Sequence, residues 1–164
     1  MLNSVGCERI KIPLIAAGGI GTGRAMLAVM NLGADAVQIG SRFVATEESS
    51  AHINFKNTVV QSNEGDTQLT LKELTPVRLI KNEFFNQIET AYQSCATKEE
   101  LTTLLGRGRA KKGMFEGDLV EGELEIGQVS GLISKIQPAQ EVVNEILTEY
   151  RFAKAEQNNL KFNF

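Results

Sequence analysis

The sequence predicts an α/β fold with a parallel sheet. Residues 13–17 (PLIAA) form a short apolar run without alternation, which is typical of a strand covered on both faces. Residues 35–39 (DAVQI) form the next strand, and the segment between the two has helical periodicity and short connections. Strand, helix and strand in this order make a right-handed βαβ unit, whose two strands lie parallel.

The helix of this unit has clear start and stop signals. Thr22 is a suitable N-cap and Gly33 suits the C-terminal position. The apolar residues of its buried side are Met26, Leu27, Val29, Met30 and Leu32. After the second strand, residues 46–61 indicate another helix, because Glu47 and Glu48 would lie favourably in its first turn.

The rest of the chain is predicted to be less regular. A polar loop at residues 62–66 leads into an edge β excursion, and a capping box (TKEE) opens one of the later helices. The expected elements are strands 67–71 and 77–80 and helices 82–95, 97–105 and 138–154. Residues 106–127 hold six glycines among charged residues, which predicts a long loop with solvated charges, and residues 158–164 predict a frayed tail.

The composition favours a protein that binds small molecules. The 164 residues are 42% hydrophobic and 23% charged, with a formal net charge of -3, so no basic surface favours nucleic acid or an anionic membrane. No apolar run is long enough for a membrane span. Cys7 and Cys95 lack the spacing of a metal or disulfide framework, so we expect no metal and a reducing, cytoplasmic setting.

Each predicted strand of the βαβ unit ends in a small-residue turn, Gly18-Gly19 or Gly40-Ser41. Glycine turns before a helix let backbone N–H groups point outward, and the helix dipole adds partial positive charge. Two such turns on neighbouring strands can hold one phosphate, as after strands 7 and 8 of (β/α)8 barrels. The spacing alone leaves a second interpretation open, in which the glycines only permit tight turns.

The sequences of the two turns and of later segments resemble one enzyme family. The segments PLIAAGGIGTGRAMLAVMNLGADAVQIGSRF, ATEESSAHINFK and LLGRGRAKKGMFEGDLVEGELEIGQVSGLI are similar to the C-terminal part of the FMN-dependent nitronate monooxygenases. The resemblance implies the C-terminal portion of a (β/α)8 TIM barrel with an irregular α/β extension. It also implies FMN as cofactor, with a small-molecule substrate, nitronate or nitroalkane, oxidised by dioxygen. It assigns the FMN phosphate to Ala17, Gly18, Gly19, Gly40 and Ser41, with Gln38 and Arg42 as weaker candidates, and a flavin contact to Gln128.

Three other families share parts of this pattern. Inosine monophosphate dehydrogenases and guanosine monophosphate reductases typically have an acid where this chain has Ala17, and alanine cannot accept hydrogen bonds from ribose hydroxyls. FMN-dependent enoyl-acyl-carrier-protein reductases share AAGGI and an EESxxH-like stretch, so enoyl reduction is the alternative function.

The resemblance implies that the catalytic groups lie outside this sequence. The family's catalytic histidine belongs to an upstream GGHxG-like segment, so we expect no catalytic residue here, and we interpret His52 as a packing or hydrogen-bonded histidine. A whole barrel needs about 250 residues. We therefore expect a truncated piece, inactive alone, in which residues 1–8 end a helix.

The predicted organisation has three parts. Residues 1–61 hold the last βα units of an FMN-binding barrel, residues 62–157 the extension and C-terminal helix, and residues 158–164 the tail. A barrel portion has unpaired sheet edges, which favour self-association. A second functional hypothesis is therefore a non-catalytic barrel remnant.

Overall fold

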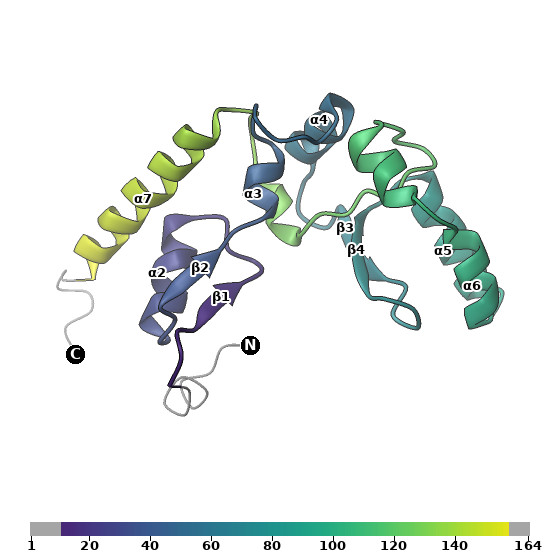
Figure 1. The fold of residues 1–164 in the computed structure, drawn as a ribbon, viewed down its shortest axis with the longest axis horizontal. Coiled ribbons are helices and arrows are strands. Elements are labelled where there is room, and N and C mark those ends of the chain that lie inside the picture. Colours follow the sequence, from purple (N-terminus) through teal and green to yellow (C-terminus); the bar gives the residue numbers. More distant parts are fainter. Residues whose placement is uncertain (1–10, 158–164) are drawn as a thin grey trace.

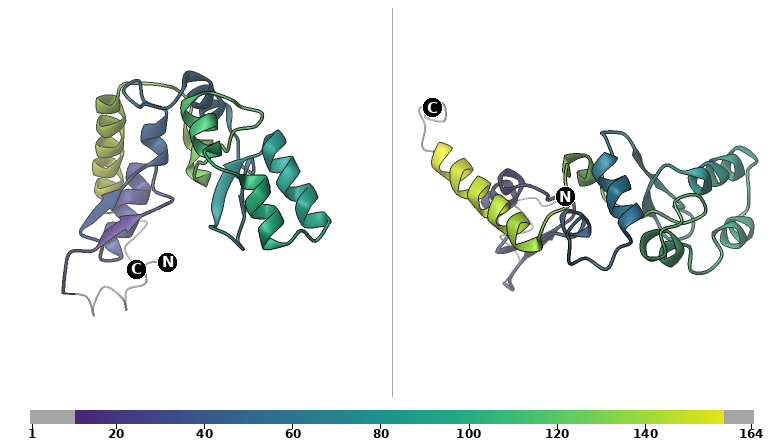
Figure 2. Two further views of the ribbon diagram at one scale, coloured as in Figure 1. Left: turned by 45° about the vertical axis from the view of Figure 1, so that its right-hand side comes forward. Right: turned by 90° about the horizontal axis from the view of Figure 1, so that it is seen from above.

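The computed structural model describes residues 11–157. The chain forms an arch, with β1, β2, α2 and α7 in one limb and β3, β4, α5 and α6 in the other (Figure 1). Figure 2 shows the same two limbs turned partly about the vertical axis and from above. The expectations for residues 1–8 and 158–164 lie outside the described residues.

The predicted βαβ unit is confirmed. Strands β1 (Ile15–Ala17) and β2 (Ala36–Gln38) pair in parallel, with Ala16 opposite Val37. Helix α2 (Gly23–Asn31) joins them, and the hydroxyl of Thr22 accepts the Ala25 N–H at 3.1 Å, as the N-cap prediction requires. β1 is covered on one face only within the described residues, whereas the sequence predicted cover on both faces: Ala16 is buried, but Ile15 is 58% exposed.

Helix α7 (Ala139–Glu156) confirms the predicted C-terminal helix and packs along α2. The two helices approach closely at Gly23, where a Cβ would collide with the backbone of Ile146 and Tyr150. The last helix therefore covers the βαβ unit in space, although a long excursion (residues 62–126 of the predicted α/β extension, without its C-terminal helix) separates them in sequence.

The predicted helix at residues 46–61 is wrong in its first half. A short helix α3 (Ser41–Val44) follows β2, and α4 (Ile53–Gln61) begins seven residues later than expected. Thr46 instead forms a parallel bridge with Gln137. The Glu48 carboxylate accepts the Ala139 N–H at 2.9 Å, so it stabilises the N-terminus of α7 rather than that of its own helix.

The predicted β excursion and helix pair are confirmed. Strands β3 (Thr67–Thr70) and β4 (Val77–Ile80) pair antiparallel, and helices α5 (Glu83–Gln93) and α6 (Lys98–Leu105) follow. The capping box is present, with Thr97 N–H donating to Glu100 at 2.7 Å. The core of this limb consists of Leu71, Leu79, Phe84, Phe85, Ile88 and Leu101, with Tyr92 packed against it.

The segment predicted as a long solvated loop is more ordered than expected. It contains a π-helical turn, η1 (Lys111–Phe115), and an antiparallel bridge from Glu125 to Leu79. Arg109 lies over the Phe84 ring at 4.3 Å and donates to the Leu105 carbonyl at 2.9 Å. The Glu123 side chain is also buried, so two of the charges predicted to be solvated belong to packed structure.

The described residues agree with the predicted α/β class. A 3-10 turn, η2 (Gln128–Leu132), leads back from the excursion toward the βαβ unit. Among residues 11–157, no helix combines the length and apolarity needed to cross a membrane.

Candidate functional site

A cavity of about 230 Å³ lies at the ends of β1 and β2. The described residues that line it are Ala17, Gly18, Gly19, Ile20, Gln38, Gly40, Ser41 and Val129. All of these are uncharged, so backbone amides, the Gln38 amide and the Ser41 hydroxyl are its polar groups. Both predicted turns therefore face one cavity.

The first turn depends on glycine. Gly18 and Gly19 have φ of 87° and 70°, in the left-handed region that glycine adopts without steric cost. A Cβ added at Gly18, Gly19 or Gly40 would meet no atom within 4 Å. The absent side chains thus leave open space beside the backbone, which is the space an anion bound by main-chain amides would occupy.

Ser41 at the second turn is held by a distant segment. Its Oγ accepts the Gly127 N–H at 3.2 Å. Because that bond uses a lone pair, the Ser41 hydroxyl hydrogen stays available to donate to an anion. Gly127 precedes η2, so the excursion contributes to the shape of the cavity when the chain returns to the βαβ unit.

The expected help from the dipole of α2 is not available. The Gly23 N–H at the start of α2 donates to the Glu149 carboxylate at 2.8 Å, so α7 supplies the anion for this helix terminus. The cavity therefore depends on the glycine turns themselves, not on the N-terminus of α2.

Two of the sequence-predicted candidates lie away from this cavity. Arg42 donates to Glu145 on α7 at 2.6 Å and is not a lining residue. Gln128 lines a different cavity of about 500 Å³, together with Glu64, Gly65 and Thr67. Ala17, Gly18, Gly19, Gly40, Ser41 and the weaker candidate Gln38 are brought together.

Two lining residues were missed by sequence reasoning. Ile20 adjoins the glycine turn, so proximity in sequence could have indicated it. Val129 comes from η2, about ninety residues after the second turn, and its apolar side chain carries no signal of such a contact.

His52 has a structural place. Its Nδ1 accepts the Asn54 N–H at 3.1 Å, which caps α4, and the backbone N–H of His52 donates to the Met114 carbonyl at 2.8 Å. Gly117 packs so closely on the imidazole that a Cβ there would collide with the ring. These contacts agree with the interpretation of His52 as a packing histidine. Residues 11–157 contain no group of three or more His, Cys, Asp or Glu arranged for a metal ion.

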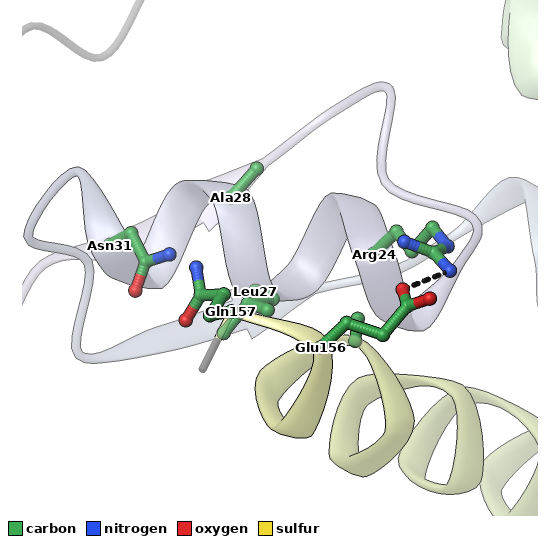
Figure 3. Close-up of a pocket in the computed structure, with 7 residues that line it drawn as sticks. Arg24, Leu27, Ala28, Asn31, Glu156 and Gln157 are labelled. Atoms are coloured by element: carbon green, nitrogen blue, oxygen red, sulfur yellow. Dashed lines mark hydrogen bonds and ion pairs between the residues drawn. The ribbon is translucent and has the colours of Figure 1, made fainter. Parts of the chain in front are cut away.

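A second cavity of about 210 Å³ lies between α2 and α7. Figure 3 shows Arg24 beside it, paired with Glu156 at 2.6 Å, and Asn31 near Gln157. Its lining residues belong to α2, α7 and the end of α7, and they include no residue of either glycine turn. It is therefore separate from the candidate phosphate site.

Solved structures resemble this chain closely. FabK from Thermotoga maritima has a TM-score of 0.81 and 35% identity, over 93% of this chain and 49% of that chain. A nitroalkane oxidase from Streptomyces ansochromogenes has a TM-score of 0.71 and 31% identity, over 94% of this chain and 44% of that chain. These likenesses support the predicted portion of a (β/α)8 barrel, with no closed barrel among the described residues.

Sequence comparison gives the family. A probable nitronate monooxygenase from Staphylococcus saprophyticus is 39% identical over 111 residues, or 65% of this chain and 31% of that protein. The chain spans less than half the length of this curated relative. A family model described as nitronate monooxygenase matches residues 1–149. Since that match covers most of its residues, the chain belongs to the nitronate monooxygenase family.

Proposed function

We propose that the cavity at the ends of β1 and β2 binds the phosphate of FMN. The observation that carries this proposal is that two turns, Gly18-Gly19 and Gly40-Ser41, open onto one cavity. The group fits the residues present, because missing side chains leave room for it and the lining offers uncharged donors without a carboxylate.

The proposed reaction of the whole enzyme is oxidation of nitronates or nitroalkanes with dioxygen. Membership of an oxidoreductase family and the likeness to a nitroalkane oxidase support this reaction class. When bound, FMN would supply the redox chemistry. The residues of this chain would bind and orient the cofactor: main-chain amides at Gly18, Gly19 and Ser41 would face the phosphate, and the Ser41 hydroxyl would donate to it.

None of the described residues around the cavity is proposed as the base that removes the substrate proton. The lining residues do not titrate near neutral pH, and the imidazole of His52 is engaged in capping α4. Proton transfer is therefore assigned to groups outside residues 11–157.

FMN binding to the purified chain tests the cavity. We expect wild type to quench flavin fluorescence on titration, and Gly19→Val to weaken binding by about 100-fold or more, since loss of two charge-assisted hydrogen bonds has about that effect. Gly40→Val should weaken FMN binding in the same way. Gly40 has a negative φ, -105°, and an added Cβ would meet only open space, so the change blocks the cavity without backbone strain.

The matched control is Gly108→Val. Gly108 also has a positive φ, 79°, and open space beside it, but it lies in the excursion. It should reproduce the backbone strain of Gly19→Val while leaving FMN affinity unchanged. Unaltered binding in Gly19→Val and Gly40→Val would disprove the phosphate site.

Substrate assays on the FMN-loaded protein separate the alternatives. Oxygen uptake with an alkyl nitronate supports the proposed reaction, whereas NAD(P)H oxidation with an enoyl thioester supports the enoyl reductase alternative. Flavin binding without either activity supports a binding portion that needs further barrel units. A colourless, aggregated protein that takes up no flavin supports the remnant hypothesis.

A further inference from the structure

The second phosphate turn is tied to α7 by an ion pair whose arginine side chain is largely buried and whose glutamate is partly exposed. Arg42, the residue after Ser41, donates to the Glu145 carboxylate at 2.6 Å. The Arg42 side chain is 12% exposed and the Glu145 side chain 42%, so the guanidinium is shielded from solvent while the carboxylate is not. Removing the carboxylate would leave a guanidinium partly buried without its partner, which is costly.

Glu145 joins further groups. It accepts from Gln137 Nε2 at 2.8 Å and pairs with Lys135 Nζ at 3.0 Å. Gln137 in turn bridges to Thr46, five residues beyond the turn. The Gln137 hydrogen bond, followed by Lys135 and Arg42, lowers the pKa of Glu145, so its carboxylate is ionised at neutral pH.

We propose that Glu145 and Arg42 are positioning residues for the Gly40-Ser41 turn. The turn is then held from two sides, by Gly127 at the Ser41 hydroxyl and by Glu145 through Arg42. Neither Glu145 nor Arg42 lines the cavity, so both act by fixing where the Ser41 amide and hydroxyl point. Small displacements of such donors weaken binding strongly. The effect on FMN rests on the proposed function.

The chain offers a control pair of the same length, whose arginine is more exposed (55% against 12% for Arg42). Arg24 and Glu156 also form an ion pair of 2.6 Å, and it likewise joins the βαβ unit to α7 (Figure 3). Neither residue lines the cavity at the strand ends. If ion pairs to α7 only stabilise the fold, loss of either pair should weaken FMN binding no more than its loss of stability explains.

The experiment compares Glu145→Gln with Glu156→Gln. Glutamine at 145 can still accept from Gln137, so the change removes the charge and leaves the neutral hydrogen bond. We expect the Kd for FMN to rise about tenfold in Glu145→Gln, equivalent to about 1.4 kcal/mol, and by less than twofold in Glu156→Gln. In Arg42→Ala/Glu145→Gln the effects should not add, since the residues act as one unit.

A second readout needs no cofactor. NMR amide shifts and hydrogen exchange should change at residues 40–42 in Glu145→Gln and stay unchanged there in Glu156→Gln. Equal effects of the two variants on residues 40–42 would overturn the positioning role. Failure of wild type to bind FMN would instead overturn the proposed function, and the amide measurements would still decide the positioning role.

Discussion

The two limbs of the arch close their hydrophobic cores to different degrees. The barrel unit (β1, α2, β2 and α7) has a sheet core of three buried residues, Ala16, Ile20 and Ala34. The extension (residues 62–126) buries large side chains completely, with Phe84 and Leu79 both at 0% exposure. The sheet of the limb that carries the candidate site is therefore the less fully covered of the two, although the same limb buries Leu27, Val142 and Ile146 on α2 and α7.

This difference follows from the kind of sheet in each limb. Parallel strands are normally covered on both faces, but the described helices cover one face of β1 and β2 and leave Ile15 exposed. The antiparallel pair β3 and β4 needs cover on one face only, which α5 and α6 provide. We therefore expect the extension to be the more stable limb and the barrel unit to gain stability when ligand binds.

The largest expected effect comes from Phe84→Ala. Phe84 is fully buried and lies under the Arg109 guanidinium, so the change leaves a cavity and removes a cation–π contact. We expect a loss of about 3–5 kcal/mol in the free energy of unfolding. Hydrogen exchange measured by mass spectrometry should show lost protection in α5 and α6 and retained protection in α2.

Gly23→Ala is the corresponding destabilising change in the other limb. Its Cβ would enter the backbone of α7 at Ile146 and Tyr150, so α2 and α7 should separate, at about 1–3 kcal/mol. Protection should then be lost in α2 and α7 and kept in α5. If each variant unprotects both limbs equally, the limbs unfold as one unit and the comparison fails.

Glu123→Gln should change how the stability of the extension depends on pH. Glu123 is 6% exposed, and burial, with Glu125 adding to it and Arg109 opposing it, raises the pKa of this carboxyl to about 7 from 4.5. The folded state thus binds the proton more tightly, and the resulting stabilisation is present below pH 4.5 and lost as pH rises through about 7. Removing the titrating group should make the variant more stable than wild type above pH 7, by roughly 1–3 kcal/mol.

Denaturant unfolding at several pH values measures this effect. The two proteins should have similar stability below pH 4.5, with the difference growing as pH rises. Glu116→Gln is the control, because Glu116 is in the same segment but its side chain is 53% exposed. A constant difference between wild type and Glu123→Gln at all pH values would contradict the assignment of the shift to Glu123.

Local signals in the sequence predicted most of the fold. Thr22 and the Thr97–Glu100 box identified helix starts because a cap is made within one turn of chain. The helix expected from residue 46 failed because Thr46 pairs with Gln137, a partner that only the folded chain brings near. The same long-range packing drew Arg109 onto Phe84, which a charge pattern cannot indicate.

In the candidate site, too, local features were predictable from the sequence and long-range contacts were not. The glycines of both turns were predictable, because glycine is the residue that adopts a left-handed backbone without strain and leaves the space of a side chain empty. The side chain of Arg42 was not, since its neighbour in sequence is Ser41 but its partner is Glu145. Val129 likewise reaches the cavity only because the extension returns to the barrel unit.

The smallest expected effect compares one N-cap from each limb. Thr22→Ala and Thr97→Ala should each cost about 1 kcal/mol near pH 7, because each removes the hydroxyl that accepts a first-turn N–H. At Thr97 the hydroxyl also donates to Glu100, and bonds from the Thr97 N–H and hydroxyl lower the pKa of that carboxyl below 4.5. α2 has no acidic residue in its own first turn, and the Glu149 carboxylate from α7 accepts the Gly23 N–H rather than the Ala25 N–H that Thr22 caps.

The pH dependence should therefore separate the two caps. A carboxyl with a lowered pKa contributes stability above pH 4.5 that is lost as pH falls through its folded-state value. The penalty of Thr97→Ala should shrink on acidification, because wild type then loses the Glu100 bond as well. The penalty of Thr22→Ala should stay constant over the same range. Parallel pH profiles for the two variants would show that Glu100 adds nothing to the cap in the extension.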